Sequence, residues 1–237
     1  MARLVHPDQD ILRLREEYAR RADAADQDDR YRADNPAYQW MISNRRQHLT
    51  ALLDRCGIAN LSQLRILEVG CGSGGIIREF ISLGAEPSRL VGLDLLMDRL
   101  RAARGPLPCT PLLCGDGQSL PFESSSFDLV LQFTAFSSIL SSAVKQHMAS
   151  EIARVLKPSA ALIWYDFWWN PLNRQTKGIP LKEVQRLFPG CSLRGEKITL
   201  APPLARSLAP RHPALAAFLE SLKVLNTHHL LILRKLP

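Results

Sequence analysis

The sequence predicts an α/β fold, a mostly parallel sheet with helices on both faces and a helical cap at the N-terminus. From residue 64 onward, short apolar segments alternate with helical ones, which is typical of strands joined by crossover helices. The first of these apolar segments runs directly into a glycine-rich turn, Gly70-Cys71-Gly72-Ser73-Gly74. The length of 237 residues suits one domain with a sizeable core. We therefore expect a single domain over residues 1–237.

The elements follow in order along the chain. Residues 8–57 have apolar positions at helical spacing, and the charged, turn-rich stretch 24–36 divides them into two predicted helices. Strands are predicted at 65–70, 89–94, 111–115, 127–132, 160–166, 192–200 and 228–235. Further helices are predicted at 74–83, 96–104, 142–156 and 181–188, with Gly84 and Lys157-Pro158 as helix terminators. The proline-rich stretch 201–222 is expected to contain helix and to be inserted before the closing strand.

The glycine turn predicts a site for a nucleotide-like ligand at the carboxyl edge of the sheet, because glycine lets the backbone come close to a ligand. Gly70, Gly72 and Gly75 also match the dinucleotide pattern G-x-G-x-x-G, and Asp94 lies 19 residues after Gly75. Glu68, however, places a carboxylate in the turn. It would repel a pyrophosphate and attract a cationic ligand, which disfavours an NAD(P)-dependent oxidoreductase without excluding it.

Four segments in order carry a resemblance to a known family. They are Glu68-Val-Gly-Cys-Gly-Ser-Gly74, Gly92-Leu-Asp94, Gly115-Asp116 with Leu120-Pro-Phe122 and Ser126-Phe-Asp128, and Ala153-Arg-Val-Leu-Lys-Pro158. In this order they resemble the class I S-adenosylmethionine-dependent methyltransferases, in their broad small-molecule branch. The resemblance is specific from about Leu64 to Leu162 and looser toward the C-terminus.

The resemblance implies a Rossmann-like sheet of seven strands whose last strand is antiparallel. It divides the domain into a helical cap or lid (1–60), a cofactor-binding core (61–166) and an acceptor-side segment with the insertion (167–237). The implied cofactor is S-adenosyl-L-methionine. Its amino-acid tail would meet the glycine turn and Glu68, its ribose Asp94, and its adenine Leu95, Asp116 and Gly117. The expected cofactor-binding residues are Glu68, Gly70, Cys71, Gly72, Gly74, Asp94, Leu95, Asp116, Gly117 and Gln132.

The methyl acceptor is expected past the carboxyl ends of the fourth and fifth strands, where three of the four tryptophans stand near Asp166. Asp166 is the first candidate for a general base, since apolar walls could raise its pKa, and His229 is the second. Arg45 or Arg46 is a candidate partner for the cofactor carboxylate. The expected substrate-binding residues, including aromatic residues of a lid, are Tyr31, Tyr38, Trp40, Phe133, Trp168 and Asn170.

The acceptor is predicted to be a small molecule, anionic, aromatic, glycan or lipid-linked, with oxygen favoured slightly as the methylated atom. Residues 171–237 hold 11 Lys and Arg against 3 acidic residues, whereas the preceding part is nearly neutral. This charge keeps an RNA methyltransferase open, but basic residues are scattered and Gln132–Ser138 lacks an Asn-Pro-Pro-aromatic motif, so nucleic acid is not expected. A non-catalytic, cofactor-binding partner subunit is a further alternative.

Cysteine and histidine usage predicts neither disulfides nor a metal site. The five cysteines form no C-x-x-C pair, and the six histidines lack metal-ligand spacing. No apolar run approaches the ~20 residues of a membrane-spanning helix, and the N-terminus has no stretch of signal-peptide type. The expected protein is cytoplasmic, either a monomer or a homodimer.

Overall fold

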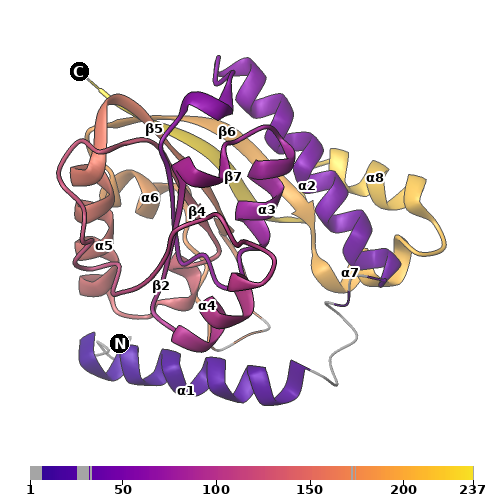
Figure 1. Ribbon diagram of the computed structural model, residues 1–237. Coiled ribbons are helices and arrows are strands. Elements are labelled where there is room, and N and C mark those ends of the chain that lie inside the picture. Colours follow the sequence, from indigo (N-terminus) through magenta and orange to yellow (C-terminus); the bar gives the residue numbers. More distant parts are fainter. Residues whose placement is uncertain (1–6, 26–31, 33, 172, 174, 237) are drawn as a thin grey trace.

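The computed structural model describes residues 7–25, 32, 34–171, 173 and 175–236 (Figure 1). Its described residues form one sheet of seven strands: β1 (Ile66–Val69), β2 (Leu90–Asp94), β3 (Leu112–Cys114), β4 (Phe127–Phe133), β5 (Leu156–Phe167), β6 (Cys191–Leu200) and β7 (Asn226–Lys235). The strand order is β3-β2-β1-β4-β5-β7-β6. Strands β1 to β5 pair in parallel, and β7 is antiparallel to both β5 and β6. The predicted Rossmann-like sheet with a reversed last strand is therefore confirmed.

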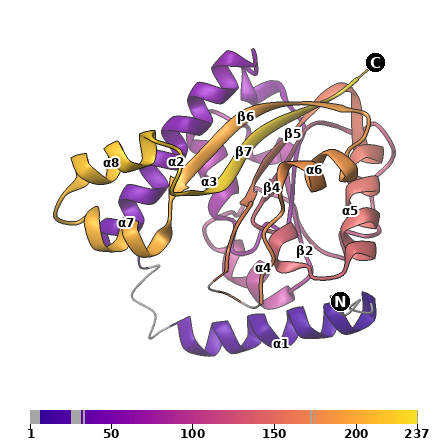
Figure 2. The same ribbon diagram turned by 180° about the vertical axis from the view of Figure 1, so that it is seen from behind.

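Two hydrophobic cores lie on opposite faces of this sheet because its strands are apolar on both sides. Leu162 and Trp164 of β5 point into one core, and Ile163 and Tyr165 into the other. The first core is covered by α5 (Ser142–Val155) and α6 (Leu181–Leu187), and the second by α2 (Pro36–Arg55), α3 (Gly75–Ser82) and α4 (Met97–Arg104). Figures 1 and 2 show these helices on the two sides of the sheet.

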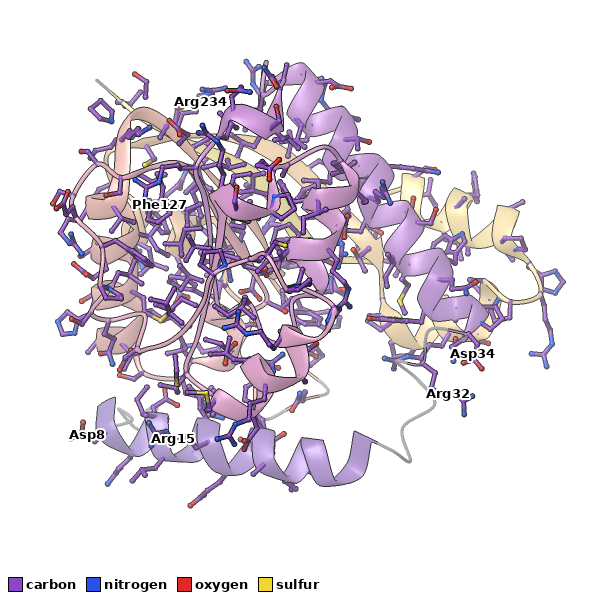
Figure 3. All side chains as sticks on the ribbon, viewed as in Figure 1. Asp8, Arg15, Arg32, Asp34, Phe127 and Arg234 are labelled. Atoms are coloured by element: carbon purple, nitrogen blue, oxygen red, sulfur yellow. The ribbon has the colours of Figure 1, made fainter. Side chains whose placement is uncertain are left out.

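The N-terminal cap consists of two helices in different places. Helix α1 (Pro7–Ala25) lies across one end of the domain, whereas α2 lies beside β6 and α7 (Pro202–Leu208) (Figures 1 and 2). Asn35 caps α2 through its side-chain oxygen, which accepts from the amides of Ala37 and Tyr38 at 2.9 and 3.1 Å. At the other end of α2, Arg234 of β7 donates to the Cys56 carbonyl at 2.5 Å (Figure 3).

The predicted insertion forms a pair of short helices, α7 and α8 (Pro213–Ser221). Its small core contains Leu200, Ala205, Ala209 and Ala216, against which Trp40 and Met41 of α2 pack. None of the described helices is long and apolar enough to cross a membrane.

The observed elements differ most from the predicted ones at β5. Helix α5 ends at Val155 as expected, but strand β5 begins at once, at Leu156 rather than at residue 160. Leu156 pairs with Phe127 of β4, and the register shifts between Phe127 and Leu129. A long-range pairing with β4 therefore extends the strand past Pro158, which local sequence signals could not show.

Candidate functional site

The glycine turn after β1 has a backbone that only glycine adopts without strain. Gly70, Gly72 and Gly74 have φ values of 79°, 54° and 75°, in the left-handed region. The amides of Gly70 and Cys71 both donate to the carbonyl of Leu93, at 2.7 and 3.0 Å. A Cβ atom on Gly70 would lie 2.8 Å from the Cβ of Ala135. The turn is thus held against the carboxyl end of β2, and its glycines leave the backbone uncovered by side chains.

Asp94 joins this turn to the one after β2. Its carboxylate accepts from the Gly72 amide at 2.7 Å and from the Leu96 amide at 2.9 Å. Arg99 on α4 approaches the same carboxylate at 3.6 Å. Sequence reasoning missed Arg99, although its place in the first turn of the helix after Asp94 was a usable signal. One buried carboxylate therefore organises both turns at the centre of the carboxyl edge.

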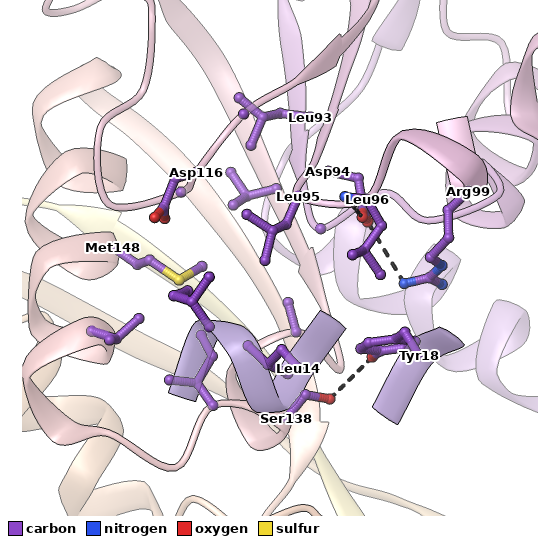
Figure 4. Close-up of a pocket in the computed structure, with 18 of the residues that line it drawn as sticks. Leu14, Tyr18, Leu93, Asp94, Leu95, Leu96, Arg99, Asp116, Ser138 and Met148 are labelled. Carbon is purple, nitrogen blue, oxygen red and sulfur yellow. Dashed lines mark hydrogen bonds and ion pairs between the residues drawn. The ribbon is translucent and has the colours of Figure 1, made fainter. Parts of the chain in front are cut away.

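A cavity of about 120 Å³, here called the inner cavity, lies beside Asp94 (Figure 4). Its walls include Leu95, Asp116 and Gly117, all of them predicted cofactor-binding residues. Asp116 accepts from the amide and the side chain of Gln118, both at 2.9 Å. The structure thus brings the predicted ribose and adenine residues around one space.

Helix α1 covers the inner cavity, through Ile11, Leu14 and Tyr18. The Tyr18 hydroxyl lies 3.2 Å from Ser138 Oγ, and Arg99 lies 4.7 Å from the centre of the Tyr18 ring (Figure 4).

Hydrogen bonds made by two side chains, Asp10 and Arg13, hold α1 in this place. Asp10 accepts from the amides of Leu140 and Ser141 at 2.8 and 2.7 Å, and Arg13 donates to the carbonyl of Ser138. Sequence reasoning expected covering residues at Tyr31, Tyr38 and Trp40 and did not identify these residues of α1. Tyr31 lies outside the described residues.

A second cavity of about 780 Å³, the turn cavity, lies between the glycine turn and α2. Glu68 and Cys71 line it, together with four arginines: Arg45, Arg46, Arg78 and Arg99. The Glu68 carboxylate is buried, and its Oε2 has no hydrogen-bond partner. Burial, and then the neighbouring charge of Asp94, raise the pKa of Glu68 well above its usual value, against the opposing effect of Arg45 and Arg99.

These groups fit a zwitterionic amino-acid tail. An ammonium would give Glu68 Oε2 the donor that it lacks, and the arginines suit a carboxylate. Arg45, a predicted partner of that carboxylate, forms an ion pair with Glu79 and lies 5.6 Å from the centre of the Phe133 ring. Phe133 lines both the inner and the turn cavities. The S-adenosylmethionine implied by the sequence therefore fits the residues present.

A third cavity of about 840 Å³, the outer cavity, lies between α2, the loop after β5 and α7. Its walls are largely apolar and aromatic, and they include two predicted substrate residues, Tyr38 and Asn170. His228 lines this cavity and stacks on Tyr165, with ring centres 4.6 Å apart and an interplanar angle of 5°. Burial, together with Arg45 and His229, lowers the pKa of His228 to about 3, so that the imidazole is neutral near pH 7.

Other predicted site residues lie outside the walls of these three cavities. Asp166 is completely buried and accepts from Gln132 Nε2 at 2.5 Å and from the Ser137 amide at 3.0 Å. Burial raises the pKa of Asp166. Trp168 donates from its indole to the Asn226 carbonyl at 2.7 Å.

Gly72 and Gly74 of the glycine turn also lie outside these walls, and two further predicted residues contact other parts of the chain. His229 lies on the face of β7 opposite to His228, beside Trp168, and its pKa is lowered to about 4 by burial and then by Lys197. Trp40 packs against α7 and α8. Among the described residues, no group of three or more His, Cys, Asp or Glu side chains could hold a metal ion.

Thr134 is the point where all three cavities meet. It follows β4 directly, and its amide donates to the Tyr165 carbonyl at 2.7 Å. Its φ is 57°, a left-handed conformation that is costly for a β-branched residue. Such strain is concentrated at functional sites. Sequence reasoning did not single out Thr134, because only the fold reveals its position and its backbone angle.

The neutral state of His228 makes stability depend on pH. Its folded pKa of about 3 lies below the unfolded value of 6.5, so its contribution is complete above pH 6.5 and is lost as the pH falls toward 3. Between about pH 7.5 and 5 we expect the wild type to lose about 2 kcal/mol more of its unfolding free energy than His228→Gln does. Urea denaturation at several pH values measures this difference. Parallel stability curves for the two proteins would contradict it.

Comparison with known proteins agrees with this geometry. Residues 66–159 match the family model described as a methyltransferase domain. The chain is 33% identical over 155 residues to phthiotriol/phenolphthiotriol dimycocerosates methyltransferase 1 of Mycobacterium ulcerans, covering 60% of this chain and 53% of that protein. It is 34% identical over 110 residues to a fatty-acid O-methyltransferase of Mycolicibacterium smegmatis, covering 46% of this chain and 39% of that protein. The chain thus spans about half the length, or less, of these curated relatives.

A solved structure shares the fold over the whole chain. The 1,6-didemethyltoxoflavin-N1-methyltransferase of Burkholderia thailandensis aligns with a TM-score of 0.68 at 15% identity, covering 100% of this chain and 93% of that one. A methyltransferase from Archaeoglobus fulgidus aligns with a TM-score of 0.56 at 17% identity, covering 80% of this chain and 94% of that one. These likenesses show the fold, and the matched model shows a methyltransferase domain over residues 66–159; together with the cavities around the glycine turn, they agree with the resemblance of the sequence to the class I S-adenosylmethionine-dependent methyltransferases.

Proposed function

We propose that this protein transfers a methyl group from S-adenosylmethionine to a hydroxyl or carboxyl oxygen of a largely apolar small molecule. The observation that carries the proposal is the meeting of the three cavities at Thr134. Two of them hold the groups that suit the cofactor, and the third has the apolar wall that suits an acceptor. The names of two relatives, a fatty-acid O-methyltransferase and a methyltransferase of phthiotriol lipids, support an apolar acceptor methylated on oxygen.

When bound, the cofactor supplies a methyl group on a sulfonium sulfur. The acceptor would attack the methyl carbon in line with the C–S bond, and S-adenosylhomocysteine would leave. Catalysis then depends mainly on holding the two partners in line in a space without water. Asp94 would accept from the ribose hydroxyls and Glu68 from the ammonium. Helix α1 would exclude water from the adenine side, and the side chains of the outer cavity would orient the acceptor.

We propose that His228 accepts a hydrogen bond from the acceptor hydroxyl and orients its oxygen, whereas the sequence suggested Asp166 or His229 as a base. His228 lines the outer cavity, and its low pKa keeps the imidazole neutral and able to accept this bond. Asp166 holds the amide of Ser137 in the turn after β4, which suits a positioning role. His229 lies on the other side of β7, beside Trp168.

Calorimetry with S-adenosylhomocysteine tests the cofactor half of the proposal, and we expect one site per chain. A screen with methyl-labelled S-adenosylmethionine over fatty acids, long-chain alcohols and phenols tests the acceptor half. Binding of the cofactor product without labelling of any acceptor would favour a non-catalytic partner subunit. Absence of binding by a folded protein would reject the proposal.

Glu68→Gln is expected to change affinity and stability in opposite directions. The neutral amide removes the charge of a buried carboxylate, so we expect the free protein to gain about 1 kcal/mol of stability near pH 7. It also removes the charged acceptor for the ammonium, so we expect affinity for S-adenosylhomocysteine to fall about tenfold. Thermal unfolding and calorimetry measure the two effects.

The stability gain should depend on pH with a definite sign. The folded pKa of Glu68 is raised, so the protonated carboxyl favours folding at low pH and that contribution is lost as the pH rises. The advantage of Glu68→Gln should therefore grow with pH. Glu86→Gln, at an exposed position after α3, is the control and should change neither quantity. A Glu68→Gln variant that is both less stable and equally tight in binding would contradict the assignment.

A further inference from the structure

We propose that residues 201–225, here called the apolar hairpin, dock on an anionic lipid surface, and that the outer cavity takes its acceptor from that surface. The docking half stands on the hairpin alone. The second half rests on the proposed function and narrows the acceptor to an amphipathic lipid whose polar end enters the cavity.

The apolar hairpin exposes most of the large apolar side chains found on the described surface. Of the eleven such residues, six lie within it: Leu204, Leu215, Phe218, Leu222, Val224 and Leu225. Phe218 is 58% exposed and Val224 79%. A concentration of exposed apolar side chains in one short segment indicates an interaction site rather than chance exposure.

Helix α8 is apolar on two faces, which a helix on the surface does not need for folding. Its inner face packs through Ala216 and Leu219 against α7. Its outer face carries Leu215, Phe218 and, one residue beyond the helix end, Leu222, at a spacing that aligns them in one stripe. Figures 1 and 2 show α8 at the margin of the molecule, beside α7 and away from α5 and α6. The outer stripe therefore has room for a flat surface.

The charge of the hairpin selects the kind of surface. Its charged residues are Arg206, Arg211, Lys223 and Glu220. Glu220 is buried and accepts from the Thr199 amide at 2.7 Å. Lys223 pairs with Glu196 at 2.7 Å, and Arg206 is half-buried in the wall of the outer cavity. The exposed charge of the hairpin is therefore that of Arg211. An apolar stripe near an exposed arginine suits the boundary of a bilayer that contains anionic lipids. A second copy docked through the same face would bring two Arg211 side chains together, which disfavours self-association there.

The hairpin also forms part of the wall of the outer cavity. Pro202, Pro203 and Leu204 line that cavity, and Leu204 is also among the exposed apolar residues. Trp169, 54% exposed, lines the cavity as well, and tryptophan favours the interface between water and lipid. The apolar side of the cavity wall thus continues into the proposed docking surface.

Vesicle flotation tests the docking. We expect the full chain to float with vesicles of phosphatidylglycerol and phosphatidylcholine and to bind vesicles of phosphatidylcholine alone more weakly. Phe218→Asp should weaken binding to the anionic vesicles by about 100-fold, because it removes a large apolar group and adds a repelled charge. Arg211→Glu should weaken it by at least about fivefold.

Leu12→Asp is the matched control, since Leu12 on α1 is also 58% exposed but lies outside the hairpin. It should float as the wild type does. Three outcomes would overturn the proposal: no flotation of the wild type, equal losses for Leu12→Asp and Phe218→Asp, or a concentration-dependent dimer that Phe218→Asp abolishes in sedimentation velocity.

Calorimetry with S-adenosylhomocysteine on the same proteins separates this proposal from the proposed function. Phe218→Asp should bind with wild-type affinity, which also shows that it is folded. Flotation without any binding of S-adenosylhomocysteine would support docking and reject methyl transfer. Binding of S-adenosylhomocysteine without flotation would reject docking and leave methyl transfer supported.

Discussion

Replacing Asp94 by alanine is expected to reduce affinity for S-adenosylhomocysteine by about 1,000-fold, measured by calorimetry. The carboxylate stands at the end of β2, where it would accept from both ribose hydroxyls. It also accepts from the amides of Gly72 and Leu96 at 2.7 and 2.9 Å, so its loss releases the glycine turn as well. The ligand contact and the shape of the turn are lost together.

Two variants make this result interpretable. Asp94→Asn keeps one acceptor oxygen and is expected to lose less affinity than alanine does. Asp98→Ala, four residues on and 90% exposed, should bind as the wild type does, because its carboxylate pairs only with Arg101 in the part of the chain described. Unchanged affinity in a folded Asp94→Ala protein would remove the basis for placing the ribose at β2.

His228→Gln is expected to lower kcat by about 100-fold with the acceptor found by screening, since loss of a contact that orients the reacting oxygen can cost that much. Affinity for S-adenosylhomocysteine should not change, because His228 lines the outer cavity and not the other two. Single-turnover measurements at saturating cofactor separate the chemical step from binding.

His229→Gln provides the control from the next position in the chain. His229 points to the opposite face of β7, toward Trp168 and Lys197, so its replacement should leave kcat within about threefold of the wild type, as expected for an uncharged group outside the cavity. If the two variants lose activity equally, or if His228→Gln is fully active, orientation of the acceptor by His228 is excluded.

Much of the sheet and of the cofactor half of the site could be predicted, because the signals for them are local. Strand periodicity located β1, β2 and β4 to within a residue or two of their ends. The glycine turn and Asp94 are adjacent to the strands that place them, so knowing that parallel strands end at one edge was enough to bring them together.

The acceptor half could not be predicted in the same way, because it depends on which face of a strand meets which distant element. Sequence alternation shows that His228 and His229 point in opposite directions, but only the pairing of β7 with β5 shows which of them faces the outer cavity. In that pairing Asp166 is opposite His229, and its carboxylate accepts from the amide of Ser137 in the turn after β4.

The first helix shows the same limit. Nothing near Asp10 in the sequence indicates that its carboxylate holds the amides of Leu140 and Ser141, some 130 residues away. Arg99 was missed although its helix was predicted, because the sequence does not show that its side chain turns toward the carboxylate of Asp94.

The position of α1 has a consequence for turnover. A molecule in the inner cavity lies between the sheet edge and this helix, and release of the loop at residues 138–141 by Asp10 and Arg13 would widen its way out. Departure of the spent donor would then be coupled to a motion of α1. Weaker contacts of Asp10 and Arg13 would speed release of the spent donor, but they would also admit water to the reacting centre. Rapid turnover and exclusion of water therefore place opposing demands on this helix.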